Sequence, residues 1–195
     1  MTGNNASEYD DSDLEAMRRL NAGEDLALND IMERWKARVI TYLLRFTGDE
    51  AVAFDLAQET FVRLYQSRQR FCPKSSTDRS FSAWLFGIAA NLGRQYLRWH
   101  RRHPTVSLEE AAQVTIRGDP AFTAESKERE IAVKSAIGAL PDDLREALIL
   151  SEYEGLTHAE IAKVSGCSVK AIERRLSRAR DQIRSGLRRY LSDPG

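Results

Sequence analysis

Apolar residues recur at steps of three and four along most of the chain, which is the period of an amphipathic α-helix. In the N-terminal half this pattern predicts four helices, over about residues 12–23, 24–46, 52–65 and 78–102. A capping box at Ser12 opens the first helix, and Pro73 and Pro104 follow the last two. We therefore expect a four-helix domain over residues 12–103, preceded by a disordered acidic tail over residues 1–11.

Residues 104–123 contain prolines, a glycine and several acids but no sustained apolar period, which predicts a flexible linker. Beyond the linker the helical period returns in four shorter segments, which predict a second helical domain over residues 124–191. The fold class that we expect is therefore all-α, with two small helical domains joined by a flexible linker.

The last two predicted helices have the layout of a helix-turn-helix. Thr157 opens a capping box and a brief helix, Gly166 breaks that helix, and Ser168 caps the final one. The face opposite the apolar Ile172 carries Lys170, Arg174, Ser177, Arg178 and Asp181, and all of these except Asp181 are hydrogen-bond donors. Such a helix suits the major groove of DNA, where an arginine fork meets two acceptors of guanine. A three-helix bundle with a basic surface of no function is the alternative.

The net charge of zero conceals four blocks of alternating sign. Residues 1–33 and 104–160 each carry a net charge of −7, whereas residues 34–103 carry +8 and residues 161–195 carry +6. Two basic blocks indicate two contacts with polyanions, and the acidic blocks would limit indiscriminate binding. Ordinary solvated helix faces give the same charge counts, so charge alone leaves both interpretations open.

Composition excludes several classes of protein. A hydrophobic fraction of 42% permits packed cores and excludes a chain that is disordered throughout. The longest uncharged run, residues 81–93, is shorter than the ~20 residues that a membrane span needs, and Met1 opens a polar acidic segment instead of a signal peptide. Cys72 and Cys167 are too few for a disulfide framework. We expect a soluble cytoplasmic protein without membrane insertion.

No enzyme site is predicted. Asp10, Asp11 and Asp13 lie in or beside the predicted tail, which would not hold two metal ions at the ~3.5–4 Å spacing of a nuclease. His100 and His103 have no nearby ligands to complete a zinc site, and glycine-rich phosphate loops and nucleophile motifs are missing from the sequence. We expect neither catalysis nor a cofactor. A stand-alone dimeric repressor is the other alternative to an enzyme, and such a protein would bind a palindrome tightly by itself.

Two parts of the chain resemble one family, in the same order. The stretch over residues 140–157 that starts LPDDLRE, together with EIA at 160–162 and SRAR at 177–180, resembles region four of bacterial extracytoplasmic-function (ECF, group 4) RNA polymerase sigma factors. DLAQETF at 55–61 and FSAWLFGIAAN at 81–91 resemble region two. The resemblance covers about residues 14–190. It implies a sigma factor that binds core RNA polymerase and directs promoter-specific initiation, with region two on the −10 element and region four on the −35 element.

The resemblance also implies contacts with polymerase, through the beta-prime clamp helices and the beta flap. The positions that match the clamp-binding part of region two are Asp55, Gln58, Glu59 and Arg63. Three of them follow one another at four-residue steps, which would give a polar ridge suited to docking a helical hairpin. A plain surface ladder of salt bridges explains the spacing equally well.

Members of this family capture an unstacked base of the −10 element beside the last helix of region two. The positions that match, or lie near, this pocket are Arg79, Asn91, Arg94 and Arg98. An amide can read a splayed base while arginines hold the strand. Trp84 and Trp99 fall in the apolar helical stripe, so we expect both to pack in the core and not to stack on bases. Gln95 stands where many relatives have aspartate, which leaves the base preference open.

In region four the resemblance assigns base reading and backbone contacts to neighbouring residues. Arg174, Ser177 and Arg178 match positions that read the −35 element, and Lys170 and Arg175 match positions that hold its backbone. Glu173 departs from the basic or neutral residue common there, and would accept from a cytosine amine or pair with an adjacent arginine.

The charge pattern and the apolar faces lead to two expectations about regulation. The balanced charge suggests that the free protein binds promoter DNA poorly until polymerase separates the two domains. Apolar helix faces that are exposed in the free protein are natural targets for an anti-sigma factor.

Overall fold

Every regular element in the structure, a computed structural model that describes residues 5–71, 81–103 and 124–188, is helical. The helices follow in the order α1 (Asn5–Asn21), α2 (Ala27–Thr47), α3 (Glu50–Ser67), the 3₁₀ helix η1 (Arg68–Arg70), α4 (Phe81–Arg102), α5 (Ala124–Gly138), α6 (Asp142–Glu152), α7 (His158–Ser165) and α8 (Val169–Gly186). The predicted all-α fold is confirmed. None of the described helices is long and apolar enough to cross a membrane.

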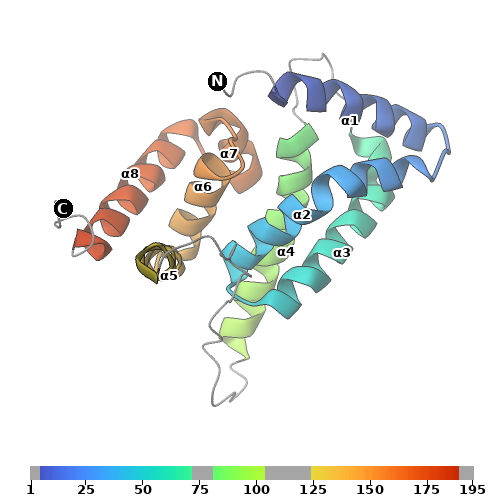
Figure 1. Cartoon of the computed structure of the whole chain (residues 1–195). Coiled ribbons are helices and arrows are strands. Elements are labelled where there is room, and N and C mark those ends of the chain that lie inside the picture. The colour runs from blue at the N-terminus through green and yellow to red at the C-terminus, as the bar shows by residue number, and fades with distance from the viewer. Residues whose placement is uncertain (1–4, 72–80, 104–123, 189–195) are drawn as a thin grey trace.

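Helices α1–α4 pack together as one unit, which we call the N-terminal bundle (Figure 1). Gly48, with a φ of 80°, ends α2 in the left-handed conformation, and Asp49 then caps α3 by accepting a hydrogen bond from the Val52 N–H at 3.0 Å. This turn lays α3 against α2. Where α4 meets α2, a Cβ on Gly93 would lie 2.7 Å from the Phe46 ring, so the glycine permits the close approach of the two helices.

The first helix begins earlier than the sequence pattern predicts. The capping box at Ser12 is not used, because α1 already begins at Asn5, so residues 5–11 are helical and not an irregular tail. Asp13 is buried and accepts hydrogen bonds from Trp35 Nε1 at 2.9 Å and from Arg34 Nε at 2.8 Å. These bonds fix α1 on α2, and a fixed helix extends at little further cost.

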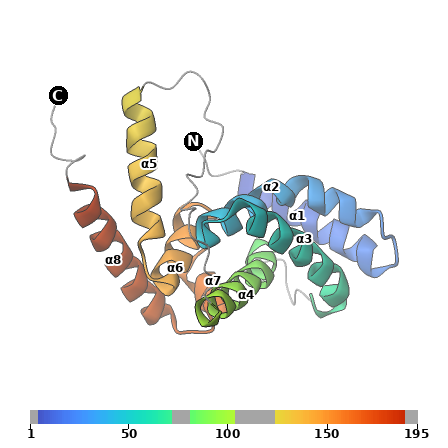
Figure 2. The ribbon, with the colours of Figure 1, turned by 90° about the horizontal axis from the view of Figure 1, so that it is seen from below.

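Helices α5–α8 form the C-terminal bundle, which packs directly against the N-terminal bundle. Figure 2 shows α6 and α7 beside α2 and α4, with α8 on the far side. The buried apolar residues of both bundles belong to one continuous cluster. The predicted flexible linker, residues 104–123, lies outside the described residues.

Candidate nucleic-acid and polymerase interface

Helices α7 and α8 form the predicted helix-turn-helix. The Thr157 hydroxyl accepts from the Glu160 N–H and the Glu160 carboxylate accepts from the Thr157 N–H at 2.8 Å, so the predicted capping box is present. Gly166 ends α7 at a φ of 65°, where glycine is favoured. Ser168 then caps α8, accepting from the Ala171 N–H at 3.2 Å. The two helices are thus held at a tight turn by the residues that predicted it.

One face of α8 is buried and the opposite face is open to solvent. Its buried residues are Ile172, Leu176 and Ala179. The exposed side carries four of the predicted −35 residues, namely Lys170, Arg174, Ser177 and Arg178. Within the described part of the chain, Arg174 and Arg178 make no ion pair, so both guanidinium groups are available to an outside acceptor.

The two neighbouring residues Glu173 and Arg175 behave differently from each other. Arg175 turns back toward its own bundle, with Nε 3.2 Å from a carboxylate oxygen of Asp143 and Nη1 3.6 Å from the sulfur of Cys167. Glu173 is exposed and is not ion-paired with any described residue. Pairing of Glu173 with an adjacent arginine is therefore not the arrangement that the structure contains.

Helix α3 carries the four predicted polymerase-binding residues. Asp55 and Gln58 are exposed. Glu59 accepts a hydrogen bond from Arg63 Nε at 2.7 Å, so one step of the predicted ridge is an ordinary helical ion pair. A pair this exposed contributes about 0.3–0.5 kcal/mol, and exchanging it for a partner's charges would cost little.

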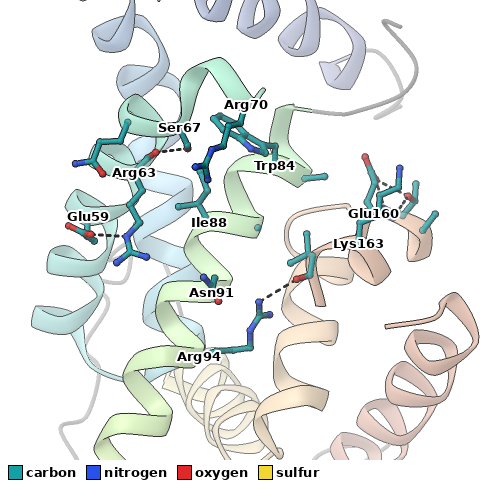
Figure 3. Close-up of a pocket in the computed structure, with 16 residues that line it drawn as sticks. Glu59, Arg63, Ser67, Arg70, Trp84, Ile88, Asn91, Arg94, Glu160 and Lys163 are labelled. Carbon is teal, nitrogen blue, oxygen red and sulfur yellow. Dashed lines mark hydrogen bonds and ion pairs between the residues drawn. The ribbon is translucent and has the colours of Figure 1, made fainter. Parts of the chain in front are cut away.

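Helix α4 carries the predicted −10 residues. Asn91 and Arg98 are exposed, Arg94 is half-buried, and Arg79 lies outside the described residues. Asn91 and Arg94 line a groove of about 1120 Å³ at the junction of α3, α4 and α7 (Figure 3). The charged residues that share this groove are Glu59, Arg63, Arg70, Glu160 and Lys163. No group of three His, Cys, Asp or Glu side chains among the described residues is arranged to hold a metal ion.

Arg94 is held by the C-terminal bundle. Its Nη1 donates to both carboxylate oxygens of Glu146, at 2.7 and 2.8 Å, and Nη2 donates to the Val164 carbonyl at 3.3 Å, the dashed line in Figure 3. Glu146 is only 3% exposed and also accepts from the Ser165 hydroxyl at 2.7 Å. In this arrangement the guanidinium group of Arg94, which the sequence predicts to bind DNA, is already bound to the Glu146 carboxylate.

Other polar contacts also join the two bundles. Arg38 on α2 donates to the buried Glu154 carboxylate at 3.1 Å, and Arg145 on α6 donates to the Phe46 carbonyl at 2.8 Å. Burial raises the pKa of Glu154 above its usual value, and Arg38 offsets this only in part. Burial likewise lowers the pKa of Arg145. Both pKa shifts mean that burial at this interface disfavours the charged forms of Glu154 and Arg145.

A buried hydroxyl adds to this desolvation cost. Tyr42 on α2 is fully buried, its hydroxyl has no hydrogen-bond partner among the described residues, and burial raises its pKa well above the usual value. A buried polar group without a partner costs about 1–3 kcal/mol. An interface that carries such costs resembles the polar contacts between domains that move relative to each other.

The two tryptophans of α4 differ in their surroundings. Trp84 packs on Phe71, with ring centroids 4.9 Å apart, as predicted. Trp99 is 54% exposed, so the prediction that it packs in the core is wrong. Figure 1 shows the reason, since the C-terminal end of α4 extends past the helices that it packs on. The apolar period continues there without a partner surface.

The contact between the bundles was not predicted from the sequence in any detail. Glu146 lies beside Arg145 in residues 144–150, where the other five residues are apolar and buried. A carboxylate whose helical position falls among buried apolar residues is the one signal that a buried charge partner exists. Which arginine serves as that partner depends on how the two bundles meet, and local sequence carries no information on this.

Comparison with known proteins gives two matching family models. The Sigma-70 region 2 model matches residues 31–103, and the Sigma-70 region 4 model matches residues 130–183. The chain is 32% identical over 194 residues to the RNA polymerase sigma-H factor of Pseudomonas aeruginosa, covering 94% of this chain and 97% of that protein. It is 30% identical over 176 residues to the ECF RNA polymerase sigma-E factor of Escherichia coli K12, covering 86% and 90%.

Two solved structures have a similar arrangement of helices. CnrH in complex with the cytosolic domain of CnrY matches with a TM-score of 0.67 and 27% identity, over 90% of this chain and 97% of that one. The sigma factor RpoE of Bartonella quintana, in complex with the anti-sigma factor NepR, matches with a TM-score of 0.67 and 23% identity, over 84% and 98%. The second likeness bears on the fold alone.

Proposed function

Because this chain belongs to the extracytoplasmic-function family of RNA polymerase sigma factors, which are subunits for transcription initiation, we propose that its two bundles read two promoter elements while bound to core polymerase. The observation that carries this proposal is the exposed basic face of α8 together with the exposed polar face of α4, on the two parts of the chain that match regions 4 and 2. Both faces offer donors to nucleic acid at the same time.

The C-terminal bundle reads the −35 element through α8. Arg174 and Arg178 donate to base edges in the major groove, Ser177 makes a further base contact, and Lys170 binds phosphate. Arg175 reaches the backbone after exchanging the Asp143 carboxylate for a phosphate. Each well-formed arginine–guanine contact contributes about 1–3 kcal/mol of discrimination.

The N-terminal bundle reads the −10 element through α4 and the segment that precedes it. The Asn91 amide reads an unstacked base, and Arg79 and Arg98 hold the strand. Arg94 joins them only after it leaves Glu146, which requires the two bundles to move apart.

Polymerase contacts complete the assignment. Asp55, Gln58, Glu59 and Arg63 on α3 dock on the beta-prime clamp helices, and the C-terminal bundle meets the beta flap. We assign the chain to group 4, divide it into the domains 12–103 and 124–191, with residues 5–11 added to the first because α1 begins at Asn5, and place it in the cytoplasm, without catalytic activity of its own.

Regulation acts on the packed arrangement of the two bundles. The Arg94–Glu146 pair withholds Arg94 from the −10 surface, so the free chain binds promoter DNA poorly. An anti-sigma factor that binds the packed bundles would keep the two bundles together. Support comes from the similarity to CnrH, whose solved structure contains the cytosolic domain of CnrY.

The test is reconstitution. Bacterial core polymerase is mixed with the purified chain on genomic DNA, association is measured by co-purification, and the transcripts are sequenced. We expect a stable complex and start sites that share two upstream elements, which core polymerase alone does not use. A chain that neither associates with polymerase nor directs initiation at defined sites would overturn the proposal.

A further inference from the structure

Helix α8 carries two acidic residues, and their surroundings differ. Asp181 is paired with Arg184, with a carboxylate oxygen 3.2 Å from Nη1 of the arginine. Glu173 is exposed, and it has no ion-pair partner among the residues that the structure describes. The Glu173 carboxylate therefore has both oxygens available to a donor from outside the chain.

Glu173 lies on the part of α8 that is suited to face DNA. It is the fifth residue of the helix, and recognition helices contact bases with their N-terminal residues. Lys170 precedes it by three positions and Ser177 follows it by four, and residues at these spacings are neighbours on a helix surface. All three side chains are exposed. A duplex that docks on Lys170 and Ser177 therefore also meets the Glu173 carboxylate.

A carboxylate in this place opposes DNA binding unless a donor on the DNA meets it. The phosphates repel it, and docking removes the water that hydrates it in the free chain. In the major groove guanine presents only acceptors, and thymine presents one acceptor and a methyl group. The donors there are the exocyclic amines of cytosine and adenine. Glu173 is thus expected to reject guanine and thymine.

Cytosine suits the carboxylate better than adenine does. The N6 amine of adenine lies beside the N7 acceptor of the same base, which would repel the second carboxylate oxygen. The cytosine edge presents its N4 amine without a neighbouring acceptor of its own. A carboxylate that accepts from this amine is also one of the standard side-chain pairings of the major groove.

We propose that Glu173 selects a cytosine in the −35 element by accepting a hydrogen bond from the N4 amine of that base. The inference rests on the proposed function of α8, and it adds to that function a residue that sets base preference. Of the two roles that the sequence leaves open for Glu173, pairing with an adjacent arginine is absent from the structure, and contact with cytosine is the one that remains.

The experiment measures which duplexes the full-length chain selects from a randomised double-stranded library. Low salt strengthens the phosphate contacts, and the exposed face of α8 is accessible while the two bundles are packed together, so no polymerase is needed. We expect the bound duplexes to share a site with one position at which cytosine is enriched and guanine and thymine are depleted. Replacing that cytosine with thymine in a single duplex should lower the affinity at least about five-fold, the lower end for one matched base contact.

Two variants separate base reading from a general effect of charge. Glu173→Ala should lose the preference at this one position, with cytosine and thymine duplexes within about two-fold of each other, and keep the preferences at the other positions. Glu173→Gln should favour adenine there, because an amide donates to N7 and accepts from N6. A merely structural role of Glu173 would not change the preferred base from cytosine to adenine.

Glu128 provides a matched control. Its side chain is exposed on α5, so Glu128→Ala changes the net charge by the same amount without altering α8. We expect Glu128→Ala to select the same sites as the unmodified chain, with cytosine still enriched at the same position.

The outcomes distinguish this inference from the proposed function. Cytosine that stays enriched in Glu173→Ala overturns the inference, as does an equal rise in affinity for all duplexes, or an unmodified chain that enriches no site. None of these results depends on polymerase. Loss of the cytosine preference in Glu173→Ala and the change to adenine in Glu173→Gln support the inference, even if reconstitution with polymerase fails and overturns the proposed function.

Discussion

A single glycine determines how closely α4 approaches α2. At Gly93 an added Cβ would lie 2.7 and 2.9 Å from two atoms of the fully buried Phe46 ring, which has no room to retreat. We expect Gly93→Ala to lower the free energy of unfolding by about 1–3 kcal/mol, the usual cost of overpacking. Urea denaturation followed by circular dichroism measures it.

The same substitution elsewhere on α4 is the control for this prediction. A Cβ at Gly87 would meet only Val164 Cγ2, at 4.0 Å, which is an ordinary contact. Gly87→Ala should therefore match the original chain or gain up to about 1 kcal/mol from the better helix propensity of alanine. If both variants were equally stable, the close approach at Gly93 would be wrong.

Glu146 joins the bundles through its charge, which a neutral replacement of the same shape tests. Glu146→Gln leaves Arg94 and Ser165 with a weaker acceptor in a buried position. We expect the free energy of unfolding to fall by about 1–3 kcal/mol and the free chain to bind promoter DNA more tightly, because Arg94 is released.

An exposed carboxylate is the control for the change at Glu146. Glu128 lies exposed on α5, and Glu128→Gln should alter stability by less than about 0.5 kcal/mol and leave DNA affinity unchanged. Denaturation and gel shifts without polymerase measure both effects. If Glu146→Gln bound DNA no better than the original chain, Arg94 would not be blocked by Glu146.

Individual residues were predictable where local geometry decides their environment. The buried and exposed sides of α8 follow from helical spacing alone, as Ile172 and Arg178 illustrate. The exposure of Trp99 was not predictable, because Trp99 continues the same helical spacing as the buried apolar residues of α4. Whether a neighbouring helix reaches that far depends on helix lengths and on how the bundle packs.

At the scale of single elements, the sharpest prediction concerns Arg178 on α8. Arg178 is exposed and unpaired with other described residues on the face opposite Leu176. We expect Arg178→Glu to abolish promoter-specific initiation and to leave polymerase binding intact, because a carboxylate repels phosphate and has no partner on guanine. Run-off transcription and co-purification with core polymerase measure the two activities.

The control lies further along the same helix. Arg184 is exposed and paired with Asp181 at 3.2 Å, nearer the C-terminal end, whereas recognition helices contact bases with their N-terminal residues. Arg184→Glu should thus retain most initiation activity. Run-off transcription that persists in Arg178→Glu would remove Arg178 from the DNA contact.

Helices with strong turn signals were predicted well. The Thr157 capping box, the Gly166 stop and the Ser168 cap all appear at the predicted positions, because each satisfies backbone groups within a few residues. The Ser12 box failed for a tertiary reason. With α1 fixed on α2 through Asp13, the helix extends past a local start signal.

The packing of the two bundles is a property of the whole molecule, and it was the least predictable feature. The charges that form it, such as Arg38 with Glu154, are more than a hundred residues apart in sequence, and no periodicity relates them. The charge blocks predicted that acidic segments would limit DNA binding by the basic ones, but not which groups would pair. The buried Tyr42 hydroxyl shows that the packing is not an optimised core.

If the packed arrangement is the one that polymerase must open, then locking it should stop initiation. Val164 Cγ2 lies 4.0 Å from the position that a Cβ would take at Gly87, so side chains at these two positions meet where α4 packs on α7. In a chain with Cys72 and Cys167 replaced by serine, we expect Gly87→Cys with Val164→Cys to crosslink on oxidation, which changes mobility on a non-reducing gel. The oxidised chain should direct no promoter-specific transcription, and reduction should restore it, whereas either single-cysteine variant should be insensitive to oxidant. Full activity of the crosslinked chain would mean that promoter binding needs no separation of α4 from α7, and that the Arg94–Glu146 pair does not restrain the molecule.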